Sequence, residues 1–163
     1  MLIEKIPEWQ LSGKDNAEIA ALLARSFDAD FGGRSFFTQP HHLRLIVRHG
    51  PIIAHMALLL RSIQLGDRLL TIAGLAEVAT DPAHRGQGIA AHLLQVAIAE
   101  AKTSPAEFLL LFGTARLYAA AGFRNILNHK AQITEPDTSL MMLPLRDRLW
   151  PDTDPLDLKG PVF

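Results

Sequence analysis

The chain has 163 residues, a formal net charge of −1, a pI near 6.6 and no cysteine. This length suits a single domain, residues 1–163, that buries roughly two thirds of its unfolded surface. The balanced charge argues against nucleic acid or an anionic membrane as a partner. The absence of cysteine excludes disulfides and a covalent acyl-cysteine intermediate.

The chain shows no signal for export or membrane insertion. Its first residues lack a basic region followed by an apolar core. Its longest apolar runs, such as residues 56–60, are far shorter than a membrane span. We therefore expect a cytoplasmic protein without a membrane partner.

The N-terminal part of the chain predicts a strand, a helix and a loop. Residues 2–7 read as a short strand, and residues 16–27 carry apolar side chains at helical spacing with Asp15 or Asn16 as the N-cap. Residues 28–40 turn to Asp, Gly, Ser and Phe, which predicts a loop with at most one helical turn. Such a loop could face a substrate.

The middle of the chain predicts three consecutive antiparallel strands. They span residues 43–48, 51–64 and 68–80, with tight turns between them. Their nearly continuous apolar content indicates a sheet that is covered on both faces, so helices must pack on both sides. Glu77 interrupts the apolar run of the third of these strands.

The second half of the chain predicts alternating helices and strands. We expect an amphipathic helix over residues 88–102, a central strand over 108–112 and a short helix over 114–121 that Gly122 ends. Residues 123–134 and 139–143 predict a β-pair joined by a turn at residues 135–137, and the tail after Pro144 reads as irregular. This order predicts an α/β fold with a mixed, largely antiparallel sheet.

The most informative motif lies between the strand that contains Glu77 and the helix that follows it. It reads Arg85-Gly86-Gln87-Gly88-Ile89-Ala90. Two glycines permit a tight turn in which successive N–H groups point into one concavity at a helix N-terminus, which makes a pocket for phosphate. The spacing differs from the three-glycine dinucleotide fingerprint, and no Lys-Ser/Thr pair follows as in a P-loop.

A second motif, Tyr118-Ala119-Ala120-Ala121-Gly122-Phe123, comes later in the chain. In this order, Arg85-x-x-Gly88-x-Ala90 and the Tyr-x-x-x-Gly-Phe helix end resemble the pyrophosphate loop and the helix after the fifth strand of the GNAT N-acetyltransferase superfamily. The resemblance implies the GNAT fold, with the sheet splayed between its fourth and fifth strands and helices on both faces. It also implies acetyl-CoA as co-substrate, bound by Val78, Ala79, Thr80, Arg85, Gly86, Gln87, Gly88, Ile89, Ala90 and Ala91.

The resemblance assigns Tyr118, the only tyrosine of the chain, to protonating the departing CoA thiolate. Its alternative is an amphipathic tyrosine at the edge of the core. Glu77 is the candidate base, because a carboxylate in an apolar strand has a raised pKa suited to taking a proton from an ammonium group, directly or through water. Its alternative is a glutamate paired with an arginine at the edge of a cleft.

Other polar residues supply weaker candidates. Asp28 and Asp30 in the predicted loop would bind a cationic amine, unless the acidic loop is simply solvated. The seven histidines show no metal-ligand spacing, so we expect no metal. His55 alternates with apolar residues, which favours a hydrogen-bonded core histidine.

Two branches of the superfamily resemble the chain further. Aminoglycoside 2′-N-acetyltransferases are similar in residues 27–31, 48–55 and 116–118, and nodulation N-acyltransferases in residues 54–56, 112–114, 149–151 and 160–161. The chain ends Pro161-Val162-Phe163, whereas the aminoglycoside enzymes end in an acidic residue, a valine and a tryptophan.

The sequence thus predicts an N-acetyltransferase that moves an acetyl group from acetyl-CoA to a primary amine of a small molecule by direct transfer in a ternary complex. One alternative is longer-chain acyl transfer from an acyl carrier protein. Another is a CoA-binding sensor or interaction domain without turnover. Exposed strands in such folds often pair, which leaves a homodimer open.

Overall fold

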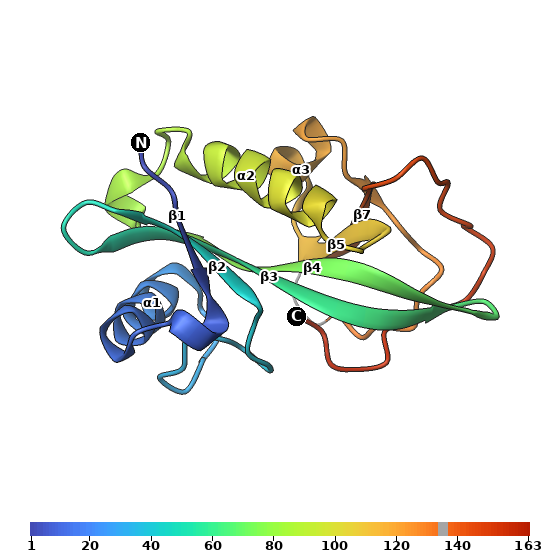
Figure 1. The fold of residues 1–163 in the computed structure, drawn as a ribbon, viewed down its shortest axis with the longest axis horizontal. Helices are drawn as coiled ribbons and strands as arrows, with labels where there is room; N and C mark the ends of the chain where they lie inside the picture. Colours follow the sequence, from blue (N-terminus) through green and yellow to red (C-terminus); the bar gives the residue numbers. More distant parts are fainter. Residues whose placement is uncertain (134–136) are drawn as a thin grey trace. The chain divides into compact units, whose positions relative to one another are not determined.

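The structure is a computed structural model that describes residues 1–133 and 137–163 (Figure 1). Its helices are α1 (Gly13–Ser26), α2 (Ile89–Thr103) and α3 (Ala115–Ala120), and 3₁₀ turns occur at Glu8–Gln10 and Pro82–His84. Its strands are β1 (Glu4–Pro7), β2 (Leu43–Arg48), β3 (Ile52–Leu65), β4 (Arg68–Thr80), β5 (Phe108–Gly113), β6 (Arg124–Asn125), β7 (Ser139–Pro144) and β8 (Leu156–Asp157).

The chain divides into two compact units. Unit 1 comprises Met1–Leu59 and Ala76–Ala97, and unit 2 comprises Leu60–Leu75 and Ile98–Phe163. The strands β3 and β4 and the helix α2 each run through both units. The single domain over residues 1–163 therefore stays a prediction.

Unit 1 is built from the antiparallel strands β1, β2 and β3, with α1 on one side of them (Figure 1). The helix buries Ile19, Leu22 and Leu23 against residues of β2, β3 and β4. Its N-cap is Ser12, whose hydroxyl accepts from the Asp15 N–H at 3.0 Å. The predicted caps Asp15 and Asn16 were wrong, because Ser12 satisfies an N–H group one turn earlier.

Unit 2 contains the parallel part of the sheet. Here β4 pairs in parallel with β5 from Ile72↔Phe108 to Leu75↔Leu111, β5 pairs antiparallel with β7, and β7 with β6. The strand order of the sheet is β1-β2-β3-β4-β5-β7-β6, with β8 paired to β3. The β4–β5 ladder ends at Leu75, so residues 76–80 of β4 continue beyond it. This is the mixed, largely antiparallel α/β architecture that the sequence predicts.

The last third of the chain departs from the prediction. In the described part of the predicted strand 123–134, Arg124 and Asn125 pair with β7 and the Ile126 N–H donates to the Leu140 carbonyl, while the tail that was expected to be irregular contributes β8 and the buried Trp150, Leu156 and Leu158. The tail is hydrogen-bonded to the preceding segment through Asn128. The side-chain amide of Asn128 donates to the Pro151 carbonyl, and its backbone carbonyl accepts from the Leu156 N–H. Those hydrogen bonds replace the predicted ladder.

Parts of two predictions fall on residues that the structure does not describe. Thr134, the last residue of the predicted strand 123–134, and Glu135 and Pro136 of the predicted turn lie outside the described residues. Within residues 1–133 and 137–163, no helix combines the length and apolar character needed to cross a membrane.

Candidate active site

The glycine motif forms the entry to α2 in unit 1. Gly86 and Gly88 both have φ +76°, a left-handed conformation that glycine adopts without penalty, and a Cβ at either position would meet nothing within 4 Å. In the described part of the chain, the N–H groups of Gly86, Gln87 and Gly88 have no backbone partner. The first helical bond runs from the His92 N–H to the Gly88 carbonyl.

These features make residues 86–91 a set of N–H groups outside the hydrogen-bond ladder at the positive end of a fifteen-residue helix. Gln87 and Ala91 are exposed, Ala90 is partly exposed and Ile89 is buried. The open space at Gly86 and Gly88 leaves room for a bulky anion to approach the backbone. The arrangement fits a pyrophosphate group.

Two polar contacts fix the segment of residues 80–85 that leads into this loop. The Arg85 Nε donates to the Thr80 carbonyl at 3.2 Å, and the Arg25 guanidinium pairs with Asp81 at 3.0 Å. The Ala83 N–H, followed by Arg25, keeps the pKa of Asp81 below its usual value, so this carboxylate stays ionised and keeps its partners. The end of α1 is thereby tied to the start of the loop.

The end of β4 places Val78, Ala79 and Thr80 directly before the loop. Ala79 is buried, whereas Val78 and Thr80 are partly exposed. The Thr80 hydroxyl is buried and has no hydrogen-bond partner among the described residues. These three residues lie beyond the β4–β5 ladder, which leaves the β5-facing edge of this segment outside that pairing.

Glu77 is the most constrained residue of the site. Its φ is +43°, which is rare for any residue other than glycine. Its carboxylate Oε1 accepts from the Phe37 N–H at 2.9 Å, and its Oε2 lies 2.5 Å from His41 Nε2. The side chain is only 4% exposed. The alternative interpretation paired Glu77 with an arginine, but its partners among the described residues are a histidine and a backbone amide.

The carbonyl of Glu77 is held by a second histidine. His55 Nδ1 lies 2.8 Å from this oxygen, and His55 Nε2 lies 3.3 Å from the buried Arg44 guanidinium. Burial and the charge of Arg44 lower the pKa of His55 to about 3, so the ring is neutral. A neutral ring with its proton on Nδ1 donates to Glu77 and accepts from Arg44.

Arg44 itself is paired within unit 1. Its guanidinium makes two hydrogen bonds with the Glu8 carboxylate, at 2.7 and 2.9 Å, and donates to the Ser35 carbonyl at 2.7 Å. Ser35 belongs to the segment between α1 and β2, which we call the 28–42 loop (residues 28–42). Arg44 and Glu77 therefore both anchor this loop.

Asp28 and Asp30 lie exposed in the 28–42 loop. An oxygen of Asp30 accepts from the Gly32 N–H at 2.6 Å and so caps a local turn. Asp28 is exposed and takes no part in this turn. Their role toward an acceptor stays a prediction.

Tyr118 lies on α3 in unit 2. Its side chain is mostly buried, and burial raises the pKa of the phenol to about 12. The ring rests on the end of β5, where a Cβ at Gly113 would lie 2.7 Å from Tyr118 Cε2, and it packs edge-on against Phe123. Its hydroxyl makes no hydrogen bond to any described residue.

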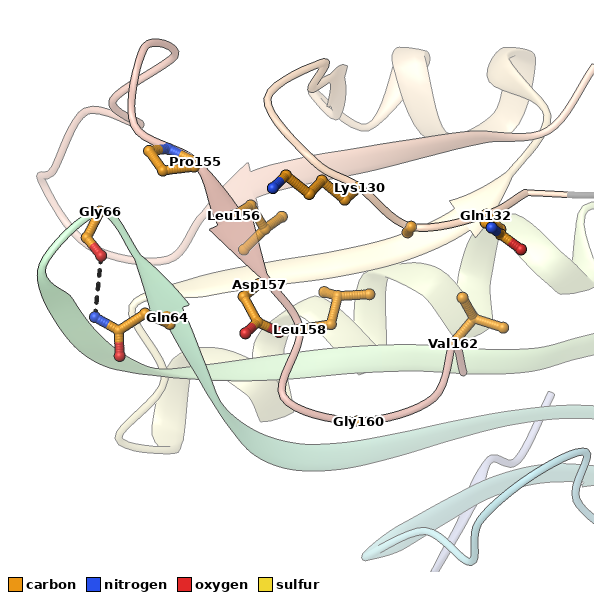
Figure 2. Close-up of a pocket in the computed structure, with 11 residues that line it drawn as sticks. Gln64, Gly66, Lys130, Gln132, Pro155, Leu156, Asp157, Leu158, Gly160 and Val162 are labelled. Atoms are coloured by element: carbon orange, nitrogen blue, oxygen red, sulfur yellow. Dashed lines mark hydrogen bonds between the residues drawn. The ribbon is translucent and has the colours of Figure 1, made fainter.

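Unit 2 also contains an open pocket of about 510 Å³. Figure 2 shows it between the β3–β4 turn, residues 130–132, β8 and the C-terminal segment, with Gln64 donating to the Gly66 carbonyl. None of the predicted site residues lines it. Among the described residues, no three His, Cys, Asp or Glu side chains are grouped so that they could hold a metal ion.

Sequence reasoning missed His41, Phe37 and Arg44 as parts of the site. Arg44 stands among the apolar residues of β2, as Glu77 does in β4. A charged residue in such a strand indicates that it has a buried partner. Phe37 takes part through its backbone, which no side-chain pattern reveals. The core role expected of His55 is confirmed.

The fold has counterparts among solved structures. A GNAT family N-acetyltransferase from Escherichia coli in complex with CoA matches with a TM-score of 0.66 and 22% identity, over 90% of this chain and 82% of that one. A GNAT family acetyltransferase from Brucella melitensis in complex with acetyl-CoA matches with a TM-score of 0.61 and 18% identity, over 91% of each chain. The ribosomal-protein-S18-alanine N-acetyltransferase from Escherichia coli matches with a TM-score of 0.63 and 20% identity, over 91% of this chain and 99% of that one.

A search of curated proteins found no match. The family model described as an acetyltransferase (GNAT) domain matches residues 10–126, which include α1, the glycine loop, α2 and Tyr118. This segment is well over half of the chain. The chain therefore belongs to the GNAT acetyltransferase family.

Proposed function

We propose that this chain is an N-acetyltransferase that moves the acetyl group of acetyl-CoA to a primary amine of a small molecule, by direct transfer in a ternary complex. The observation that carries the proposal is the loop of Gly86 and Gly88, with its left-handed glycines, open approach and N–H groups outside the α2 ladder. Family membership and the CoA and acetyl-CoA complexes of structural neighbours support it.

The donor site would consist of two backbone segments of unit 1. Residues 85–91 would hold the pyrophosphate through N–H groups and the helix dipole. Val78, Ala79 and Thr80 would pair with the pantetheine arm, and an N–H of this segment would stabilise the oxyanion. Bound acetyl-CoA would supply the acetyl group as a thioester.

Tyr118 would act on the leaving sulfur. Its high pKa keeps the phenol protonated at any physiological pH, so a donor is always present. A thiol has a pKa of about 8.5, which makes it a stronger acid than this phenol. Donation of a hydrogen bond to the developing thiolate would therefore carry more of the effect than complete proton transfer.

Glu77 would assist the loss of a proton from the amine. Because both of its carboxylate oxygens already face the 28–42 loop, we propose the route through water rather than direct transfer. Asp28 and Asp30 on the same loop would favour a cationic acceptor.

The choice of donor tests this proposal against acyl carrier protein chemistry. Calorimetric titration of the chain should show binding of acetyl-CoA and of free CoA, and weaker binding of a long-chain acyl-CoA. Failure to bind acetyl-CoA, combined with turnover of an acyl carrier protein donor, would replace the proposal with the nodulation type of reaction.

A further inference from the structure

We propose that Glu77 is a positioning residue that clamps the end of β4 to the 28–42 loop. One residue would then set both the backbone that receives the donor and the loop that faces the acceptor amine. The inference deepens the proposed function and rests on it. It has two arms, one formed by the backbone of Glu77 and one by its carboxylate.

The backbone arm follows from the position of Glu77 in β4. The β4–β5 ladder ends at Leu75, and Glu77 is the residue directly before the segment that would bind the pantetheine. A left-handed residue within a strand redirects the peptide groups that follow it. The φ of +43° at Glu77 therefore sets the orientation of Val78, Ala79 and Thr80.

This conformation is strained for a residue with a Cβ, and such strain persists only where neighbouring groups enforce it. His55 provides one of these groups, since its Nδ1 lies 2.8 Å from the Glu77 carbonyl. His55 is fully buried and is fixed in turn by Arg44. The carbonyl of Glu77 is thus held from the neighbouring strand β3.

The side-chain arm joins Glu77 to the loop at two points. Oε1 accepts from the Phe37 N–H and Oε2 contacts the His41 imidazole, while the side chains of Glu77 and His41 are 4% and 1% exposed. A carboxylate placed in this way is directed at the 28–42 loop. The residue whose backbone His55 holds therefore also fixes the loop through its carboxylate.

Substitutions at Glu77 separate the two arms. Glu77→Ala removes the carboxylate and keeps the Cβ strain, so acetyl-CoA affinity should fall about tenfold or more. Glu77→Gly also removes the carboxylate but adopts a positive φ freely, so its affinity should stay within about threefold of the parent. Glycine normally weakens a strand relative to alanine, so this order reverses the usual one. Calorimetry with acetyl-CoA measures both.

Amide hydrogen exchange at Phe37 reports the side-chain arm. Exchange should accelerate at least tenfold in Glu77→Ala and Glu77→Gly, because both lose the acceptor of this N–H. Glu77→Gln keeps an oxygen at that place and should retain both the protection and the acetyl-CoA affinity. Glu4→Ala is the matched control, because it removes another unit 1 carboxylate, the partner of Arg48, and should change neither reading.

The results decide between distinct failures. If the parent chain does not bind acetyl-CoA, the proposed function fails. If the parent binds but Glu77→Gly binds no more tightly than Glu77→Ala, the backbone arm is wrong. If Phe37 stays equally protected in Glu77→Ala, the side-chain arm is wrong. Should Glu77→Ala fail to fold, the Gly and Gln variants still test the two arms.

Discussion

Tyr118 combines a buried ring with a hydroxyl that has no hydrogen-bond partner among the described residues. The ring is mostly buried on Gly113 at the end of β5, while the hydroxyl makes no hydrogen bond within the described residues. Burial of the ring holds the proton on the oxygen, and the lack of an internal acceptor leaves that proton available to a ligand.

Tyr118→Phe tests this assignment because it keeps the ring and removes the donor. We expect kcat to fall by roughly 10²-fold to 10³-fold, the range for loss of one hydrogen-bond donor to a developing negative charge, while the Kd for acetyl-CoA changes by no more than a few-fold. The fall should be smaller for a donor with a more acidic thiol. Full kcat under conditions where chemistry limits the rate would reduce Tyr118 to a packing residue.

His55 makes the stability of the fold depend on pH. Its pKa is about 3 in the folded chain against an ordinary value of 6.5, so between these values the unfolded chain binds one more proton. The stabilisation is complete above pH 6.5 and is lost as the pH falls toward 3, by at most about 1.4 kcal/mol per pH unit.

His55→Asn should flatten this dependence, because asparagine offers an N–H near the place of Nδ1 and does not titrate. We expect a shallower fall in the free energy of unfolding between pH 6.5 and 4, measured by urea denaturation at several pH values. His49→Asn, at an exposed turn position, is the control and should keep the slope of the parent. An unchanged slope in His55→Asn would contradict the neutral buried imidazole.

Among the structural elements, the loop at residues 85–88 is the one that we assign to binding the acetyl donor. Its two glycines have the same left-handed φ, which by itself favours glycine, and a Cβ at either position would meet no atom within 4 Å. This open space would let a ligand approach the backbone N–H groups closely.

Gly88→Val and Gly86→Val should abolish measurable acetyl-CoA binding, because a branched side chain disfavours the positive φ and blocks the N–H groups. Gly50→Val is the matched control, since Gly50 has φ +74° and open space at a turn outside the motif. It should carry a similar cost in thermal stability and leave the Kd for acetyl-CoA unchanged. Tight binding by both loop variants would remove the phosphate-loop assignment.

The elements best predicted from the sequence are those with a strong local pattern. The strands β2, β3 and β4 and the helix α2 follow their apolar periodicity to within a residue or two, and Gly122 ends α3 as expected. The strand predicted over residues 123–134 is shorter than expected in its described part, because Asn128 bonds to Pro151 and Leu156 of the tail instead of β7. No local pattern encodes that competition.

The sequence predicts those residues of the candidate site that belong to a recognisable motif. It does not predict those that only tertiary contacts bring to the site. The glycine loop, Tyr118 and the unusual Glu77 are visible in the sequence. The contacts of Glu77 with His41 and the Phe37 amide join residues about forty positions apart, and the left-handed backbone at Glu77 occurs at a residue other than glycine, where no local pattern predicts it.

For the whole molecule, the proposed function is an enzyme that would carry the acetyl group directly from donor to acceptor. The chain has no cysteine, so a covalent acyl-cysteine intermediate is excluded. Direct transfer requires both substrates to be bound together, with the donor on the glycine loop and the amine near the 28–42 loop. The protein itself should never become acetylated in the cycle.

The most direct measurement follows the release of free CoA thiol from acetyl-CoA in the presence of a panel of cationic and neutral small-molecule amines, with mass analysis of amine and protein. Direct acetyl transfer predicts that thiol release depends on a particular amine, that this amine becomes acetylated and that the protein stays unmodified. The variant Tyr118→Phe should release thiol much more slowly. Binding of acetyl-CoA without amine-dependent release across the panel, or an acetylated protein intermediate, would contradict direct acetyl transfer.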